Sequence, residues 1–271
     1  MRLSGSNLAL HYEDVVVARD LSIEIPDGQV SVLIGPNGSG KSTLLRALSR
    51  LLKPKEGAVV LDGKAIEQYS TKEVARRLAI LPQVLVAPES ITVAELVAYG
   101  RFPQRRSIGG MTDEDRAAIE WAMRVTGMLD LRDRGVDHLS GGQRQRAWIA
   151  LVLAQGTDLI LLDEPTTFLD IAYQLEVLEL LRHLNEAEGK TIVMVLHDIN
   201  MACEYSHRLF ALRDGKLIAQ GDPRVVLTST LIREVFGIDA HILEHPTSHA
   251  PMCVPIAVPH AVDHSPVPAP A

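Results

Sequence analysis

The sequence is poor in aromatic residues, in cysteine and in long apolar runs. Aromatic residues are 4% of the 271 residues while hydrophobic residues are 46%, so a sizeable core would be built from aliphatic side chains. The two cysteines, Cys203 and Cys253, lie far apart and outside any CxxC motif, which argues against a disulfide framework and favours a reducing compartment. No apolar run approaches the roughly 18 residues that a membrane-spanning helix needs. The first residues also lack a signal-peptide pattern. We therefore expect a soluble, cytoplasmic chain.

An excess of positive charge is missing as well. The formal net charge is −7, which argues against a general affinity for nucleic acid or for anionic membranes. We therefore expect no nucleic-acid partner, although a local basic patch remains open.

The most informative stretch is a glycine-rich loop between an apolar run, Val30–Ile34, and a helical pattern over residues 44–52. This strand, loop and helix order is that of a phosphate-binding loop, whose backbone N–H groups surround an anion at a helix N-terminus. Lys41 is placed to reach the β- and γ-phosphates, and Ser42 to hold Mg²⁺ through its hydroxyl. A glycine-rich turn with a chance lysine would not match every fixed position. The loop consists of Gly35, Pro36, Asn37, Gly38, Ser39, Gly40, Lys41, Ser42 and Thr43.

Polar residues follow three further apolar runs, where an α/β sheet places its ligand-binding groups. Asp163 ends the run Leu159–Leu162 and is a candidate second Mg²⁺ ligand, while Glu164 is suited to polarise an attacking water. His197 follows the run Ile192–Leu196 and is a candidate sensor of the γ-phosphate. Gln83 follows another short run and could contact the metal or its water. The alternatives are a surface Asp-Glu pair, a structural histidine and an ordinary loop glutamine.

A second candidate anion site precedes a convincing helical pattern over residues 144–155. Ser140, Gly141, Gly142 and Gln143 place a hydroxyl and two glycines at a helix N-terminus. The site could read the same nucleotide or one held by another copy of the chain. The alternative is an ordinary serine N-cap. Tyr12, near the end of an N-terminal strand, could stack on a base or be a half-buried strand residue.

The order of the patterns predicts an α/β fold. Residues 1–34 indicate short strands, helical spacing dominates residues 84–154, and the later aliphatic runs are typical of parallel strands buried on both faces. We expect a phosphate-loop NTPase core with a mostly parallel sheet flanked by helices, an N-terminal antiparallel β region and an inserted helical subdomain. The core would comprise residues 1–83 and 155–240, and the helical subdomain 84–154. Within the latter, residues 101–110 indicate an exposed basic loop.

Residues 241–271 differ from the rest, with seven of the 15 prolines, five of the ten histidines and no lysine or arginine. We expect this tail to be extended or disordered, because proline disrupts helices and sheet ladders. A transition-metal site is the alternative, because imidazole and thiolate are suitable ligands. Its candidate ligands are His241, His245, His249, Cys253, His260 and His264.

Taken in order, these motifs resemble the nucleotide-binding subunit of an ATP-binding cassette transporter over about residues 3–240. The segment LSGGQ separates that family from other phosphate-loop ATPases. The resemblance implies that Tyr12 stacks on adenine, that Asp163 coordinates Mg²⁺, that Glu164 is the catalytic base and that His197 is the switch histidine. It further implies that residues 140–143 close on ATP bound by a partner subunit and that Asp170 couples the two sites. Phe168 departs mildly from the family's commoner small residue.

Within the family, residues 69–77, 81–83 and 92–101 look like the importer group for ferric siderophores, haem and vitamin B12, and are most similar to its ferric-siderophore members. The resemblance implies a homodimer of ATPase subunits on an integral membrane permease, at the cytoplasmic face of the membrane. A substrate-binding protein would take part indirectly. The segment after Gln83 would accept a coupling helix of the permease. Arg101, Arg105 and Arg106 could belong to that surface or be a solvated face.

Two other classes of function remain open. A non-transport cassette ATPase, such as an iron–sulfur assembly protein, would share the same motifs, whereas repair members carry coiled-coil insertions and translation factors two cassettes. A simple phosphate-loop kinase would not need LSGGQ or His197. The cargo itself is chosen by a binding protein and a permease outside this sequence, so haem and cobalamin remain alternatives to a ferric siderophore.

Overall fold

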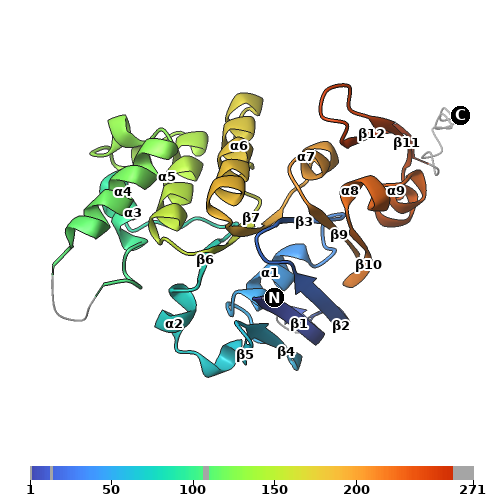
Figure 1. The fold of residues 1–271 in the computed structure, drawn as a ribbon, viewed down its shortest axis with the longest axis horizontal. Helices are drawn as coiled ribbons and strands as arrows, with labels where there is room; N and C mark the ends of the chain where they lie inside the picture. The colour runs from blue at the N-terminus through green and yellow to red at the C-terminus, as the bar shows by residue number, and fades with distance from the viewer. Residues whose placement is uncertain (1, 13–14, 106–109, 259–271) are drawn as a thin grey trace, which may run out of the picture.

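The computed structural model describes residues 2–12, 15–105 and 110–258. Its centre is a six-stranded sheet in the order β10-β9-β3-β8-β7-β6 (Figure 1). Strands β6, β7, β8, β3 and β9 run parallel, and β10 is antiparallel to β9. The carboxyl ends of the parallel strands therefore meet at one edge of the sheet. The strands are β3 (Val30–Ile34), β6 (Leu78–Leu81), β7 (Leu159–Asp163), β8 (Thr191–Val195), β9 (Arg208–Arg213) and β10 (Lys216–Gly221).

Both faces of this sheet are buried, as the continuous aliphatic runs predict. In β8, Ile192 and Met194 join the core cluster on one face, and Val193 and Val195 join the cluster on the other. This alternation follows from the pleat of a strand, which points successive side chains to opposite faces. The sheet is thus a rigid platform between two aliphatic cores.

The N-terminal antiparallel region is confirmed as a separate sheet in the order β2-β1-β4-β5. It lies on the same side of the central sheet as helix α1 (Lys41–Leu48), below the sheet in Figure 1. Helix α2 (Thr71–Ala75) leads from this region into β6. The strands are β1 (Leu3–Tyr12), β2 (Val15–Ile25), β4 (Glu56–Leu61) and β5 (Lys64–Ala65), followed by a 3-10 turn at Ile66–Gln68.

A helical insertion separates β6 from β7, as predicted. It contains α3 (Val93–Tyr99), α4 (Asp113–Val125) and α5 (Gly141–Ala154), with 3-10 turns at Leu129–Leu131 and Val136–His138. Each helix starts with a capping box, in which a Ser or Thr side chain and an acidic or amide side chain three residues later satisfy two backbone N–H groups.

The remaining helices follow the later strands. Helices α3–α7 lie above the central sheet in Figure 1, and none of the helices in the described part of the chain is long and apolar enough to cross a membrane. The later helices are α6 (Ile171–Glu188), α7 (Ile199–Glu204), α8 (Pro223–Val226) and α9 (Ser229–Phe236).

The prediction of an extended or disordered tail that forms no sheet ladder is wrong for residues 241–257. Strands β11 (Asp239–Glu244) and β12 (Pro251–Ala257) form an antiparallel hairpin. Pro251 is the first residue of β12, and Pro255 lies at an irregularity of the register opposite Ala240. Both are positions where a strand tolerates a residue without an N–H group. Residues 259–271, including His260 and His264, lie outside the described residues. The described residues contain no group of three His, Cys, Asp or Glu side chains suited to a metal.

Candidate functional site

The loop after β3 has the backbone geometry that its glycines allow. Gly35, Gly38 and Gly40 all have positive φ angles, and Gly40 precedes the first residue of α1. A Cβ atom on Gly35 would lie 2.1 Å from the carbonyl oxygen of Leu212, so no larger residue fits there. The loop therefore packs directly on the neighbouring strand β9, with its backbone turned toward the N-terminus of α1.

Lys41 is buried at the start of α1 and folds back over the loop. Its Nζ donates to the carbonyl oxygens of Gly35 at 2.8 Å and Pro36 at 2.9 Å. Burial lowers the pKa of Lys41, although the nearby carboxylates of Glu164 and Asp163 oppose this. The ammonium group is thus held at the loop, where an anion would stabilise its charge.

Ser42 and Asp163 join the loop to the end of β7. Ser42 Oγ donates to Asp163 Oδ1 at 2.9 Å, and Asp163 is buried. Burial raises the pKa of Asp163, while the hydrogen bond from Ser42 acts in the opposite direction. A hydroxyl and a carboxylate that lie this close are oxygen ligands of the type that Mg²⁺ prefers.

Glu164 is the centre of a small hydrogen-bond network. Its Oε1 accepts from Gln83 Nε2 at 3.0 Å and lies 2.8 Å from His197 Nε2, and its Oε2 accepts from the Thr167 hydroxyl at 3.2 Å. Glu164 also has a φ of 55°, a left-handed conformation that costs a non-glycine residue about 1–3 kcal/mol. The ends of β6 and β8 thus bring two side chains predicted from the sequence, Gln83 and His197, onto the predicted carboxylate at the end of β7.

Most of these groups border one cavity of about 580 Å³, whereas Asp163 lies behind Ser42 and outside its lining. Tyr12 lies at its edge with half of its surface exposed, and the Arg46 guanidinium lies 5.7 Å from the centre of its ring. Among the described residues, three of the predicted loop residues do not line the cavity, although they surround Lys41: Gly35, Pro36 and Ser39. The lining consists of Tyr12, Val15, Val17, Asn37, Gly38, Gly40, Lys41, Ser42, Thr43, Gln83, Glu164 and His197.

The second candidate anion site is separate from this cavity. Ser140 caps α5 by accepting from the backbone N–H of Gln143, and the Gln143 side chain accepts from the backbone N–H of Ser140. Within the described residues, none of Ser140, Gly141, Gly142 and Gln143 lines the cavity. The phosphate loop and the segment of residues 140–143 therefore lie at two different places in one chain.

Helix α5, which begins with these residues, instead packs on the segment that follows Glu164. A Cβ atom on Gly142 would lie 3.2 Å from Leu169 Cδ2, and the buried Gln145 donates to the carbonyl oxygen of Pro165 at 3.1 Å. Asp170 caps α6 by accepting from the N–H of Tyr173. Phe168, between these residues, has a φ of 66° and is 82% exposed. Sequence reasoning assigned no role to Gln145, for which no local motif gave a signal, or to Thr167, which it noted only as part of the stretch from Thr167 to Asp170.

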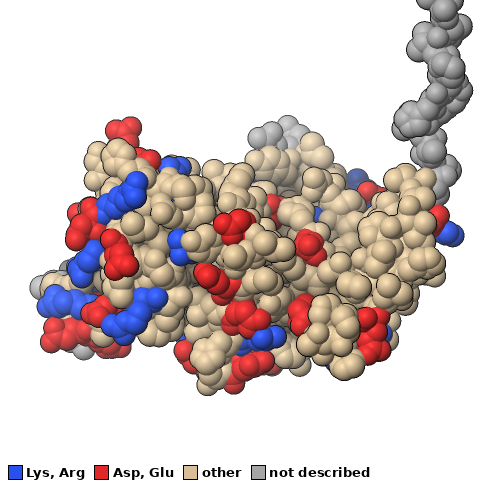
Figure 2. Space-filling view, turned by 90° about the horizontal axis from the view of Figure 1, so that it is seen from above, with Lys and Arg blue, Asp and Glu red and all other residues tan. Residues whose placement is uncertain are grey.

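The prediction that residues 101–110 form an exposed basic loop is wrong for its first residue. Arg101 is buried and its Nε donates to Asp115 Oδ1 at 2.8 Å, because the loop folds back between α4 and the end of α5. Arg105 is half-buried, and residues 106–109 lie outside the described residues. At the left end of the face in Figure 2, where the helical insertion lies, acidic and basic side chains are intermixed.

Comparison with known proteins decides the family. The family described as ABC transporter matches residues 18–167. The chain belongs to the ABC transporter family. It is 51% identical over 251 residues to the iron(3+)-hydroxamate import ATP-binding protein FhuC of Bacillus subtilis (strain 168), with 93% of each chain covered. Identity and coverage are the same for the ferric enterobactin transport ATP-binding protein FepC of Escherichia coli (strain K12).

Solved structures agree with this assignment. A metal-chelate type ABC transporter in an inward-facing conformation matches with a TM-score of 0.79 and 28% identity, covering 94% of this chain and 97% of that one. A dimeric ABC transporter cassette matches with a TM-score of 0.74 and 30% identity, covering 81% and 98%. This ABC protein is therefore an ATP-binding, transport-coupled ATPase with the α/β fold of its family.

Proposed function

We propose that this ABC ATPase hydrolyses MgATP between two copies of the chain and thereby drives import of a ferric siderophore through a membrane permease. The observation that carries the proposal is the network on Glu164, which joins three strand ends at the edge of a phosphate-loop cavity. The cargo is proposed from relatives, because proteins named for the import of hydroxamate, enterobactin, achromobactin and petrobactin iron complexes are 48–51% identical over 251 residues.

Glu164 is the proposed general base. Its carboxylate is oriented by Gln83, His197 and Thr167 and faces the cavity, so it is suited to accept a proton from an attacking water. Lys41 would stabilise negative charge on the phosphates once its Nζ exchanges the loop carbonyls for phosphate oxygens. His197, at the end of β8, would contact the γ-phosphate, and Tyr12 would stack on the adenine.

The residues beside the loop fit a magnesium ion. Ser42 and Asp163 would hold it, Asp163 directly or through a water, because the buried Asp163 carboxylate, whose pKa is raised by burial, gains from a neighbouring divalent cation. Gln83 uses its amide nitrogen on Glu164 and offers its amide oxygen to the ion or to a water on it. When bound, the ion neutralises charge on the phosphate oxygens.

The separation of the two anion sites supports a head-to-tail dimer. In a closed pair, the N-terminus of α5 in one copy, with Ser140, Gly141, Gly142 and Gln143, would meet the phosphate loop of the other. Asp170 follows the segment that packs on α5 and would couple the two sites. The dimeric cassette among the structural relatives supports such an arrangement.

The permease would dock at the segment after Gln83, where Val84 and Val86 are exposed. The chain would then lie peripherally at the cytoplasmic face of the membrane and receive cargo indirectly from a substrate-binding protein. The relatives named as import proteins favour transport over a role in iron–sulfur assembly. Purification of the chain together with a membrane permease would support a role in transport. Absence of the chain from the membrane fraction would contradict that role.

The test of the catalytic assignment is Glu164→Gln, which keeps the size of the side chain and removes the base. We expect ATP binding to remain and turnover to fall by about 100-fold or more. Full hydrolysis by this variant would refute the assignment. The cargo is tested separately, by uptake of labelled ferric siderophore, haem and cobalamin into vesicles that contain the complete transporter. Uptake of haem or cobalamin alone would reassign the cargo.

A further inference from the structure

The C-terminal hairpin is attached to α7, the short helix that begins two residues after His197. Asn200 makes a paired contact, since its Oδ1 accepts from the backbone N–H of Cys253 at 2.7 Å and its Nδ2 donates to the carbonyl oxygen of Cys253 at 3.3 Å. An amide side chain can satisfy both backbone groups of one residue in this way, as a neighbouring strand would. Asn200 thus pairs with the outer edge of β12.

Two further contacts join α7 to the hairpin of β11 and β12. Ser248, in the turn between β11 and β12, donates to the carboxylate of Glu204 at the end of α7. Cys203, one helical turn after Asn200 and on the same face of α7, is buried, as is Cys253 on β12. Burial raises the pKa of Cys203 to about 12, and both cysteines belong to the same core cluster.

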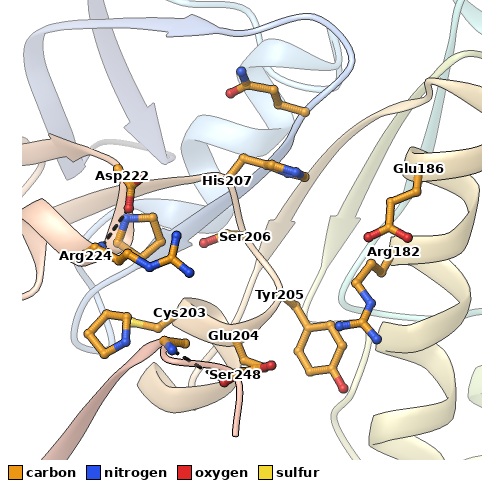
Figure 3. Close-up of a pocket in the computed structure, with 14 residues that line it drawn as sticks. Arg182, Glu186, Cys203, Glu204, Tyr205, Ser206, His207, Asp222, Arg224 and Ser248 are labelled. Atoms are coloured by element: carbon orange, nitrogen blue, oxygen red, sulfur yellow. Dashed lines mark hydrogen bonds between the residues drawn. The ribbon is translucent and has the colours of Figure 1, made fainter. Parts of the chain in front are cut away.

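The end of α7 is also joined to α6, because the hydroxyl of Tyr205, which follows α7, donates to Glu179 Oε1 at 2.8 Å. A cavity of about 500 Å³ lies between the end of α7 and α6. Figure 3 shows Cys203, Glu204 and Ser248 at one side of this cavity and Arg182 and Glu186 of α6 at the other. The end of α7 therefore borders a cavity that both α6 and the hairpin line.

The start of α7 is tied to the nucleotide site. Asp198 caps the helix by accepting from the N–H of Met201, and the preceding residue, His197, contacts Glu164. Only two residues, Asp198 and Ile199, lie between His197 and Asn200 in the chain. A shift of α7 would therefore move His197 relative to Glu164.

We propose that Asn200 is a positioning residue, which holds α7 on the C-terminal hairpin and so keeps His197 in place on Glu164. This inference rests on the proposed roles of Glu164 and His197. It assigns the hairpin a part in hydrolysis, whereas the sequence predicts an extended or disordered tail there, with a transition-metal site as the alternative. Through Asn200 and α7, the hairpin thereby keeps His197 in position.

The test is Asn200→Ala in the full-length chain, measured with the permease present or absent under identical conditions. We expect kcat for ATP hydrolysis to fall by about tenfold, because small misplacements of catalytic groups cost large factors in rate. The KM for ATP should change by less than about twofold, since the contacts of the phosphate loop remain. Asn200→Asp retains the acceptor for the N–H of Cys253 but places a carboxylate oxygen against its carbonyl oxygen, so it should recover only part of the rate. Unchanged kcat in Asn200→Ala at a temperature where it is folded would overturn the proposal.

A matched control and a double variant separate positioning from simple stabilisation. His241→Ala alters an exposed side chain on the face of the hairpin opposite Cys253 and should leave kcat unchanged. In a His197→Ala background, Asn200→Ala should have no further effect on the residual turnover, because its route to Glu164 is gone. An undiminished further loss would overturn the proposal. If His197→Ala itself left kcat unchanged, the proposed role of His197 would fail instead, independently of the Asn200 contacts.

Discussion

The Thr167 hydroxyl donates a hydrogen bond to Glu164 Oε2 across a distance of 3.2 Å. The other carboxylate oxygen, Oε1, is contacted by Gln83 and His197. The two oxygens are therefore held by groups from different segments, and rotation of the carboxylate would break contacts on both. Thr167 is the one of these partners that belongs to the same turn as Glu164, so it fixes the carboxylate independently of β6 and β8.

Replacing Thr167 with valine, which has nearly the same shape, should slow hydrolysis. We expect kcat to fall by about tenfold, because a hydrogen bond to a charged group is worth about 1.5 kcal/mol or more. The KM for ATP should stay within about twofold of the unaltered enzyme, since Thr167 contacts Glu164 and not the phosphate loop. Steady-state ATPase measurements over a range of ATP concentrations give both values. Thr167→Ser keeps the hydroxyl and should be nearly as active as the unaltered enzyme, and a fully active Thr167→Val would show that the bond does not orient the base.

A site shared between two copies predicts complementation between two inactive variants. Lys41→Ala disables the phosphate loop, and Ser140→Arg places a bulky charge at the N-terminus of α5. Each variant alone should be almost inactive. In an equal mixture, half of the pairs contain one copy of each variant and so one intact site, and we expect about a quarter of the unaltered activity to return. The measurement is ATPase activity of the mixture at constant total protein.

Ser70→Arg is the matched control for this experiment. Ser70 caps α2 with the same type of capping box as Ser140, so both substitutions remove an equivalent helix cap, worth about 1 kcal/mol. Ser70→Arg should keep its own ATPase activity. If mixing Lys41→Ala with Ser140→Arg restored nothing while both chains still bound each other, the shared site would be excluded.

The parts of the structure that the sequence predicted are those set by local patterns. The loop from Gly35 to Thr43, the strand ends at Asp163 and His197, and the cap at Ser140 each have a short signature whose chemistry demands particular residues. Because parallel strands end at one edge, their polar residues could be expected to meet without any knowledge of tertiary contacts.

The missed features depend on contacts between segments far apart in the chain. Arg101 looked like one member of an exposed basic loop, because nothing nearby in the sequence indicates that it would meet Asp115 inside the helical insertion. The hairpin of β11 and β12 was missed for a different reason. Its prolines argue against a ladder in general, yet a two-stranded hairpin has free edges on which they are tolerated.

The buried pair of Arg101 and Asp115 predicts a pH-dependent loss of stability. Arg101 donates to Asp115 Oδ1, and both backbone and hydroxyl of Thr112 donate to Oδ2. The hydrogen bond from Arg101 is the main reason that the pKa of Asp115 lies below its usual range. A carboxyl group whose pKa is lower in the folded than in the unfolded protein stabilises the fold at pH values above its unfolded-state pKa of about 3.9. That contribution disappears as the pH falls through the lower pKa of the folded state.

Asp115→Asn should therefore destabilise the protein by about 3 kcal/mol at neutral pH, since it leaves the Arg101 charge buried without a counter-charge. The difference in unfolding free energy between this variant and the unaltered protein should shrink as the pH falls below about 4, where the native Asp115 also becomes protonated. Urea unfolding between neutral and acidic pH measures both effects. Asp113→Asn is the control, because Asp113 forms only an exposed pair with Arg116 and should change stability by less than about 1 kcal/mol. An equal loss in the two variants, or a difference that does not depend on pH, would contradict a stabilising role for the buried pair.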